Sequence, residues 1–296
     1  MLNRRLDDIH SLITEPAADS LAELYHENSK LRRINSREYG RFVSSLTKLP
    51  YLIEKMAHSY KVYPTAKTIS LPLISLPLDE WSACASSLTL EEVIQRRRTV
   101  RTFSGEPLSL SIISKLLHYT YGITTTSTPP PGLRNRNVCF RAAPSAGALY
   151  PLEVYLVTWR TLGLNPGIYH YCVPTHSLEL VAAGNFADEA TEYTFCEDLI
   201  DTAAGFFFVT GIFQRTMLKY NERGYRFVLL DAGHMAENMC LMACSLGLGI
   251  VPIGGFQDDE INRVLAVDGI NETVVYAMAV GVISPESASP SLDTNC

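Results

Sequence analysis

The chain has 296 residues, 47% of them apolar and 19% charged, which is typical of a soluble globular protein and excludes a disordered, collagen-like or coiled-coil chain. Its formal net charge of -6 argues against a protein that mainly binds nucleic acid, because neutralising phosphates requires a basic surface. Residues 227–296 contain nine acidic residues and one basic residue, Arg263, so an anionic ligand must find its countercharges in residues 1–226.

Seven widely spaced cysteines without a CxxC pair predict a reduced, cytoplasmic protein with no structural zinc site. The N-terminal residues lack the apolar core of a signal peptide. The longest apolar stretches, GFFFVTGIF and VVYAMAVGVI, have the length of strands. We therefore expect no membrane span.

Residues 1–86 are expected to form an N-terminal helical extension and a proline-rich linker. Charged helical stretches lie around residues 20–33 and 38–60. Residues 63–81 contain prolines between apolar residues, which predicts an extended linker or an edge strand. Residues 87–296 are expected to form a second domain.

The second domain should begin with two short helices. The sequence TLEE predicts a capping box between Thr89 and Glu92, with the helix running to about Arg98. Ser109 should cap the next helix, and Gly122 should end it. Residues 123–140 have the composition of a loop, and loops of this length are often functional.

Strands dominate from residue 152 onward. A helix is expected over residues 186–199, and a second helix, apolar nearly all round and therefore buried on several sides, over 225–246. No glycine-rich nucleotide-binding turn follows a strand, and helices and strands do not alternate regularly. We therefore predict an α+β fold with strands at 152–159, 167–171, 178–184, 205–213 and 273–282 and a short helix at 258–265.

The first candidate site is the basic run RRRTVRTF at residues 96–103. Arg97, Thr99 and Arg101 alternate, so on an extended segment they would point to the same side. Two guanidinium groups and a hydroxyl would suit a phosphate. The alternative is a solvated basic helix end.

Two further segments combine small residues with turns. In RAAPSAGALYP (141–151), small side chains would let backbone amides approach a ligand, and Ser145 adds a hydroxyl. In GIVPIGGF (249–256), Gly254 and Gly255 would allow a flat ligand to reach the backbone. The alternative for the first segment is an ordinary turn.

The fourth candidate is KYNERGYRF (219–227), where Lys219 and Tyr220 are adjacent titratable groups. By itself such a pair is more often part of an ordinary surface.

In their order along residues 88–282, RRRTVRTF, PSAGALYP, IVPIGGF and VVYAMAVG resemble the nitroreductase superfamily of FMN-dependent, homodimeric oxidoreductases. The finer pattern is similar to its SagB-type branch, the peptide dehydrogenases that form thiazoles and oxazoles. That pattern consists of YHENSK, PSAGALYP, GLNPGIYHY and KYNERGYRFVLLDAGHMAENM.

The resemblance implies a nitroreductase-like fold, with a mixed β-sheet flanked by helices and FMN at a homodimer interface. It implies that Arg97, Thr99 and Arg101 bind the FMN phosphate and ribityl chain. It also implies that the isoalloxazine ring is lined by Pro144, Ser145, Ala146 and Gly147. The backbone of Gly254 and Gly255 would meet the reactive nitrogen of this ring. Many nitroreductases place a basic residue on the phosphate after the final strand. Residues 282–296 of this chain contain no Lys or Arg, so the earlier arginines must hold the phosphate.

The implied activity is oxidation of thiazoline or oxazoline rings in a modified peptide to thiazole or oxazole, with Lys219 and Tyr220 as the catalytic pair. The expected partners are an azoline-containing peptide and a cyclodehydratase, with no nucleic acid, membrane or metal. One alternative is an NAD(P)H-dependent flavin reductase acting on nitro compounds or quinones. Another is a non-catalytic scaffold of a peptide-modifying complex.

Overall fold

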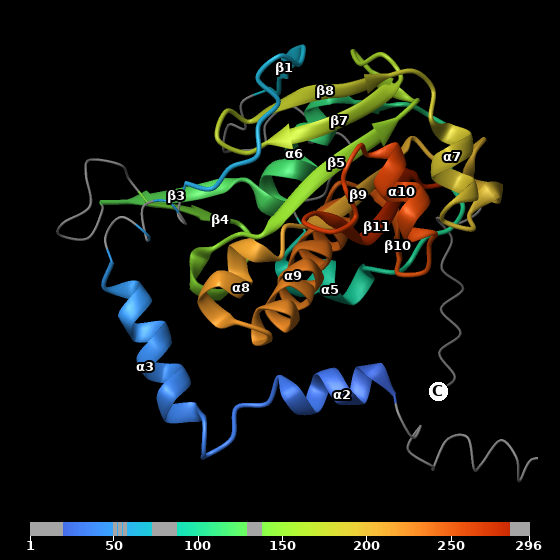
Figure 1. Cartoon of the computed structure of the whole chain (residues 1–296). Coiled ribbons are helices and arrows are strands. Elements are labelled where there is room, and N and C mark those ends of the chain that lie inside the picture. Colours follow the sequence, from blue (N-terminus) through green and yellow to red (C-terminus); the bar gives the residue numbers. More distant parts are fainter. Residues whose placement is uncertain are drawn as a thin grey trace, which may run out of the picture.

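A computed structural model describes residues 20–49, 52, 55, 58–72, 88–128 and 138–284. Its principal element is a seven-stranded sheet in the order β1-β8-β7-β5-β9-β11-β10 (Figure 1). All neighbours in this sheet are antiparallel. The strands are β1 (Thr68–Ser70), β5 (Leu152–Thr158), β7 (Gly167–Cys172), β8 (Ser177–Ala183), β9 (Gly205–Gly211), β10 (Leu248–Ile253) and β11 (Thr273–Val282).

The helices surround this sheet. In chain order they are α2 (Leu21–Asn28), α3 (Ser36–Thr47), α5 (Leu90–Arg96), α6 (Leu110–Tyr121), η1 (Ala146–Ala148), α7 (Ala187–Glu192), η2 (Glu197–Leu199), α8 (Gln214–Tyr220), α9 (Arg223–Ser245) and α10 (Asp258–Val264). Two small pairs join β2 (Leu108–Ser109) to β6 (Thr161–Leu162) and β3 (Ile123–Ser127) to β4 (Val138–Arg141).

Both faces of the sheet are buried. Leu152, Val154 and Leu156 of β5 pack with α6 and α9, whereas Tyr155 and Val157 point to the opposite side, in a second core cluster that includes residues of α7 and α10. This alternation follows from the two-residue period of a strand. The central strands are therefore largely apolar on both sides, although they also carry the buried polar residues Glu153, His170 and Thr210, and α9 runs along one face of the sheet (Figure 1).

The expected α+β architecture is confirmed, with three differences in detail. The principal sheet is antiparallel where a mixed sheet was expected, because short connections such as the β7–β8 hairpin join neighbouring strands; parallel pairing occurs in β2–β6. Residues 123–127 and 138–141 form paired strands and not only a loop, while residues 129–137 lie outside the described residues. The helix expected over 186–199 divides into α7 and η2, because Phe195 has a left-handed φ of 55°.

The predicted helix starts at Thr89 and Ser109 are confirmed. Thr89 and Glu92 form the reciprocal capping box, and the Ser109 hydroxyl accepts the Ile112 amide. In the N-terminal extension the helices are shorter than expected, and most of residues 50–57 and all of 73–87 lie outside the described residues. α2 and α3 run along the outside of the body, and β1 pairs with β8 as an edge strand (Figure 1).

Candidate functional site

The segment Pro144–Tyr150 forms a tight turn held by side chains. The Ser145 hydroxyl donates to Asp231 Oδ2 at 2.6 Å and accepts the Tyr150 amide at 2.9 Å. Gly147 has a φ of 65°, which favours glycine. A Cβ there would lie 2.6 Å from the Tyr220 hydroxyl and 2.8 Å from Lys219 Nζ, so the turn presents bare backbone to both groups.

Lys219 and Tyr220 end helix α8 and meet this turn. The Lys219 ammonium lies 5.2 Å from the Tyr220 ring centroid. Burial lowers the pKa of Lys219. Burial also raises the pKa of Tyr220, with smaller contributions from Tyr39 and Asp231. The structure thus places a lysine that loses its proton more easily next to a tyrosine that keeps its own.

Asp231 of α9 belongs to this site, although the sequence analysis did not select it. The side chain is 4% exposed, and burial raises its pKa against the opposing hydrogen bonds from Ser145 and the Ala146 amide. A carboxylate in a helix that is otherwise largely apolar was the available signal, because such a group needs donors when it is buried. The turn at Ser145 and Ala146 supplies them.

The basic run at residues 96–103 lies apart from this turn and contacts α9 and β10. Arg97 is half-buried and approaches Glu237 at 3.9 Å, while the Val100 amide donates to the Ile250 carbonyl. Thr99 and Arg101 are exposed. Asp231 and Glu237 are six residues apart on α9, roughly 9 Å of helix rise. Asp231 contacts the turn at Ser145, and Glu237 contacts Arg97, so α9 is the element that both sites share.

Gly254 and Gly255 follow the end of β10 and are exposed. A Cβ at either position would meet no atom within 4 Å, so a flat molecule could approach their backbone. Gly254 also lines an open pocket of about 500 Å³ together with aromatic and apolar residues of α8 and α9. This volume is in the range of pockets that bind small molecules.

The residues present suit FMN. Arg97 and Arg101 offer planar guanidinium donors for a phosphate, and the open backbone of Gly254 and Gly255 suits the flat ring system. In the described part of the chain no group of three His, Cys, Asp or Glu side chains is arranged to hold a metal ion.

Arg141, which begins the RAAPSAGALYP segment but was assigned no role from the sequence, packs against the turn. It is 8% exposed, and its guanidinium lies 4.4 Å from the ring centroid of Tyr121 and 4.8 Å from that of Tyr150. Its backbone amide donates to the Tyr150 hydroxyl at 3.0 Å. These cation–π contacts fix Tyr150, which has a left-handed φ of 46° at the end of the turn.

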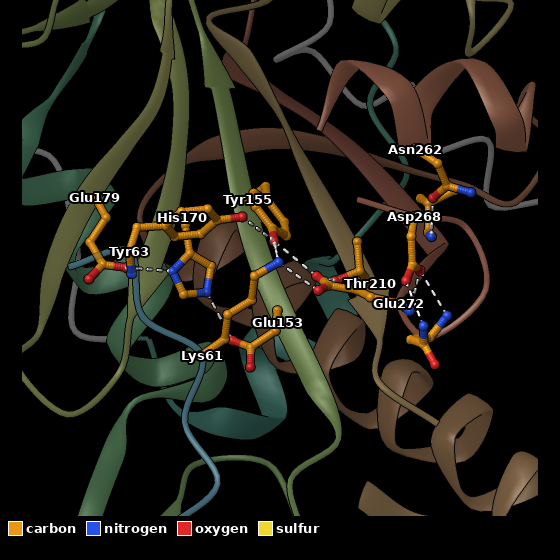
Figure 2. Close-up of polar contacts among 12 residues, drawn as sticks. Lys61, Tyr63, Glu153, Tyr155, His170, Glu179, Thr210, Asn262, Asp268 and Glu272 are labelled. Carbon is orange, nitrogen blue, oxygen red and sulfur yellow. Dashed lines mark hydrogen bonds and ion pairs between the residues drawn. The ribbon is translucent and has the colours of Figure 1, made fainter. Parts of the chain in front are cut away.

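A buried polar network extends from α8 into the sheet, and Figure 2 shows the part of it around Glu153, His170 and Glu179. Arg215, four residues before Lys219, donates to Glu153 Oε1 at 2.5 Å and to the Tyr150 carbonyl at 3.4 Å. His170 Nε2 donates to Glu153 Oε2 at 2.9 Å, and His170 Nδ1 lies 2.8 Å from Glu179 Oε2. Arg215 therefore joins α8 to β5 and to the turn.

The network also includes Lys61 and Tyr63, which precede β1. Lys61 Nζ donates to the Tyr155 hydroxyl and to Glu272, both at 2.6 Å, and the Tyr63 amide donates to Glu179 at 3.2 Å (Figure 2). The Thr210 hydroxyl also donates to Glu272, at 2.7 Å. Lys61 and Tyr63 are thus bonded to strands β5 and β8 and to the loop before β11, which composition alone did not indicate.

The Nitroreductase family model matches residues 94–282, and the chain belongs to this family. Its fold and its four motif segments agree with that assignment. In the described part of the chain, no helix combines the length and apolarity that crossing a membrane requires.

The chain is similar to three curated proteins. The nitroreductase-family protein MJ1384 of Methanocaldococcus jannaschii is 34% identical over 194 residues, which cover 66% of this chain and 91% of the relative. The trifolitoxin-processing protein TfxB of Rhizobium leguminosarum is 32% identical, covering 58% of this chain and 47% of its own. The microcin B17-processing protein McbC of Escherichia coli is 31% identical, covering 54% and 57%. The chain spans about half the length of these two peptide-processing relatives.

Solved structures share the fold. A nitroreductase-family protein of Anabaena variabilis has a TM-score of 0.66 at 26% identity, covering 88% of this chain and 46% of that chain. A chain of the Escherichia coli microcin synthetase McbBCD complex with truncated pro-MccB17 bound has a TM-score of 0.54 at 22% identity, covering 86% and 98%.

Proposed function

We propose that the protein is an FMN-dependent dehydrogenase that oxidises thiazoline or oxazoline rings of a modified peptide to thiazole or oxazole. The observation that carries this proposal is the Lys219–Tyr220 pair held against the bare backbone of Gly147. The 31–32% identity to two peptide-processing proteins supports a peptide substrate.

Lys219 is proposed as the base. Aromatisation removes a proton from the ring carbon beside the amide carbonyl and a hydride from the neighbouring ring carbon. A base must be unprotonated to act, and burial shifts the pKa of Lys219 in the direction that favours the neutral amine. Burial keeps Tyr220 protonated, so its hydroxyl can orient the substrate by hydrogen bonding.

The cofactor would be held by Arg97, Thr99 and Arg101 at its phosphate and ribityl chain, and by the backbone of Gly254 and Gly255 at its ring. Pro144, Ser145, Ala146 and Gly147 would line the ring. Bound FMN would supply the hydride acceptor, leaving position and protonation to the protein.

The test of this function uses the purified, FMN-loaded protein and a peptide that carries an azoline ring. We expect the peptide to lose 2 Da by mass spectrometry, with one equivalent of flavin bleached under anaerobic conditions. A peptide of unchanged mass, while NADPH bleaches the flavin rapidly, would contradict the proposal and favour a general flavin reductase. The 34% identity over 91% of MJ1384 makes that the second candidate.

The phosphate assignment predicts a binding defect. Replacing Arg97 or Arg101 with alanine should weaken FMN binding at least about tenfold, because a charge-assisted hydrogen bond contributes roughly 1.5 to 3 kcal/mol. Equilibrium titration of apoprotein with FMN measures this. Arg263→Ala, at an exposed arginine of α10, is the matched control and should bind FMN normally. Unchanged affinity in both Arg97 and Arg101 variants would remove the assignment.

We further propose a cytoplasmic homodimer with FMN at its interface, acting with a cyclodehydratase partner. Leu229 and Leu230 of α9 are 43% and 57% exposed in the single chain, and a second copy would cover them. The division into an extension at 1–86 and an FMN-binding domain at 87–296 is proposed as well.

A further inference from the structure

Two motifs of the sequence have no role in the function proposed above. One is YHENSK at residues 25–30, and the other is the part of KYNERGYRF that follows the lysine–tyrosine pair. Nearly 200 residues separate them in the chain. In the structure they face each other where α8 ends and α9 begins (Figure 1).

Hydrogen bonds join the two motifs directly. The Tyr25 hydroxyl donates to the Glu222 carbonyl at 3.0 Å. Arg223 donates to the Ser29 carbonyl at 2.9 Å, and Arg226 donates to the His26 carbonyl at 2.7 Å. Each bond ends on a backbone oxygen, so the contacts fix the path of the two chain segments and not only the positions of side chains.

Aromatic rings add to this contact. The Tyr25 and Tyr225 rings pack edge to face with centroids 5.1 Å apart, and Tyr225 stacks on Phe213 at 4.9 Å. Arg226 lies over the Tyr25 ring at 5.8 Å. Phe213 and Tyr225 also line the pocket beside Gly254, so α2 supports a wall of that pocket.

The turn that α2 contacts is strained and lies directly after the catalytic pair. Asn221 has φ 48° and ψ -145°, a conformation that is strained for a residue other than glycine. At Gly224 a Cβ would lie 2.8 Å from the Met217 backbone, so α8 and α9 are in close contact here. A strained turn persists when its surroundings hold it in place.

We infer that α2 is a clamp that holds the α8–α9 turn and thereby positions Lys219 and Tyr220 against Gly147. Tyr25 and Arg226 are positioning residues in this arrangement. The inference rests on the proposed function for the role of the pair, but the clamp itself is defined by contacts. Helix α3 of the extension also contacts α8, the helix that carries the pair.

The first test compares variants of the full-length, FMN-loaded protein in azoline oxidation. Tyr25→Phe removes one hydrogen bond and keeps the ring, and we expect kcat to fall about fivefold with KM unchanged. Arg226→Ala should lower kcat about tenfold, with partial rescue in Arg226→Lys. FMN content and Tm should stay at wild-type values. Glu27→Gln is the matched control, because Glu27 of α2 pairs with Lys30 and Arg32 within the extension, and it should react at the wild-type rate.

The second test does not depend on the reaction. Trace labelling with acetic anhydride across a pH series, followed by mass spectrometry of the Lys219 peptide, reports the pKa of that amine. Its neighbours are the Tyr220 ring and the Gly147 backbone, with Asp231 of α9 and Tyr39 of α3 acting on the adjacent Tyr220. Releasing the clamp would hydrate the ammonium, so the midpoint should rise toward the ordinary lysine value in Arg226→Ala.

The two tests distinguish failure of the clamp from failure of the proposed function. A wild-type kcat and a wild-type labelling midpoint in both Tyr25→Phe and Arg226→Ala would overturn the clamp while leaving the proposed function intact. If the wild-type protein oxidises no azoline peptide, the proposed function fails, and the labelling midpoint alone decides the clamp. Loss of FMN or a lower Tm with an unchanged rate per bound flavin would also overturn it, since that is a purely structural role.

Discussion

Replacing Lys219 with alanine is expected to lower the rate of single-turnover flavin reduction by an azoline peptide about 10²-fold or more, the usual scale for removing a general base. Tyr220→Phe should lower it as well, because the hydroxyl that faces Gly147 is lost. Both variants should retain FMN and the oligomeric state. Anaerobic stopped-flow absorbance measures the rate without reoxidation by oxygen. Lys115→Ala on α6 is the control and should react normally.

The pH dependence of the same rate gives a sharper result. Lys219 acts in its neutral form, so the rate should rise with pH through the pKa of Lys219 and level off above it. Because burial lowers this pKa, the rising limb should lie below the range of an ordinary lysine. The limb should vanish in Lys219→Ala. If the variants differ from wild type in KM with kcat preserved, the pair only binds substrate, and the proposed chemistry is wrong.

Local rules predicted the parts of the fold that neighbouring residues determine. Thr89 and Ser109 cap their helices as expected because a hydroxyl before an apolar run satisfies free amides wherever it occurs. The long helix near residues 225–246 was recognised from its length and apolar pattern. The strands at 123–127 were missed, although the run of β-branched threonines there favours a strand as much as a turn.

The site was predictable only where its residues are chemically conspicuous. Lys219 and Gly147 were selected from the sequence, and the structure brings them together. Asp231 and Arg215 were not selected, because the partners that make them important, Ser145 and Glu153, lie 86 and 62 residues away. The same holds for Lys61, whose bond to Glu272 spans 211 residues. Spacing along the chain carries no information on such pairs.

Replacing Glu153 in the buried network is expected to have a large effect on the free energy of unfolding. Glu153 is 3% exposed and accepts from both His170 and Arg215. Burial opposes its ionisation, but the hydrogen bond from His170 and the charge of Arg215 outweigh this, so the pKa of Glu153 lies below its ordinary value. Glu153→Ala leaves two buried donors without their acceptor. Removing one partner of a buried pair costs about 3 to 5 kcal/mol, so the free energy of unfolding should fall by that amount.

Urea unfolding at pH 7, at fixed protein and FMN concentrations, measures the loss, since bound ligand adds its own stabilisation. Glu260→Ala, which breaks the exposed pair with Arg263, should change the free energy by less than about 1 kcal/mol. The sign with pH follows from the lowered pKa. Glu153 stabilises the fold fully above the unfolded glutamate pKa of about 4.3, and its contribution is lost as the pH falls through the lower folded value. Wild-type stability should therefore fall more steeply in acid than that of Glu153→Ala, and parallel curves would show that the carboxylate is not held by its partners.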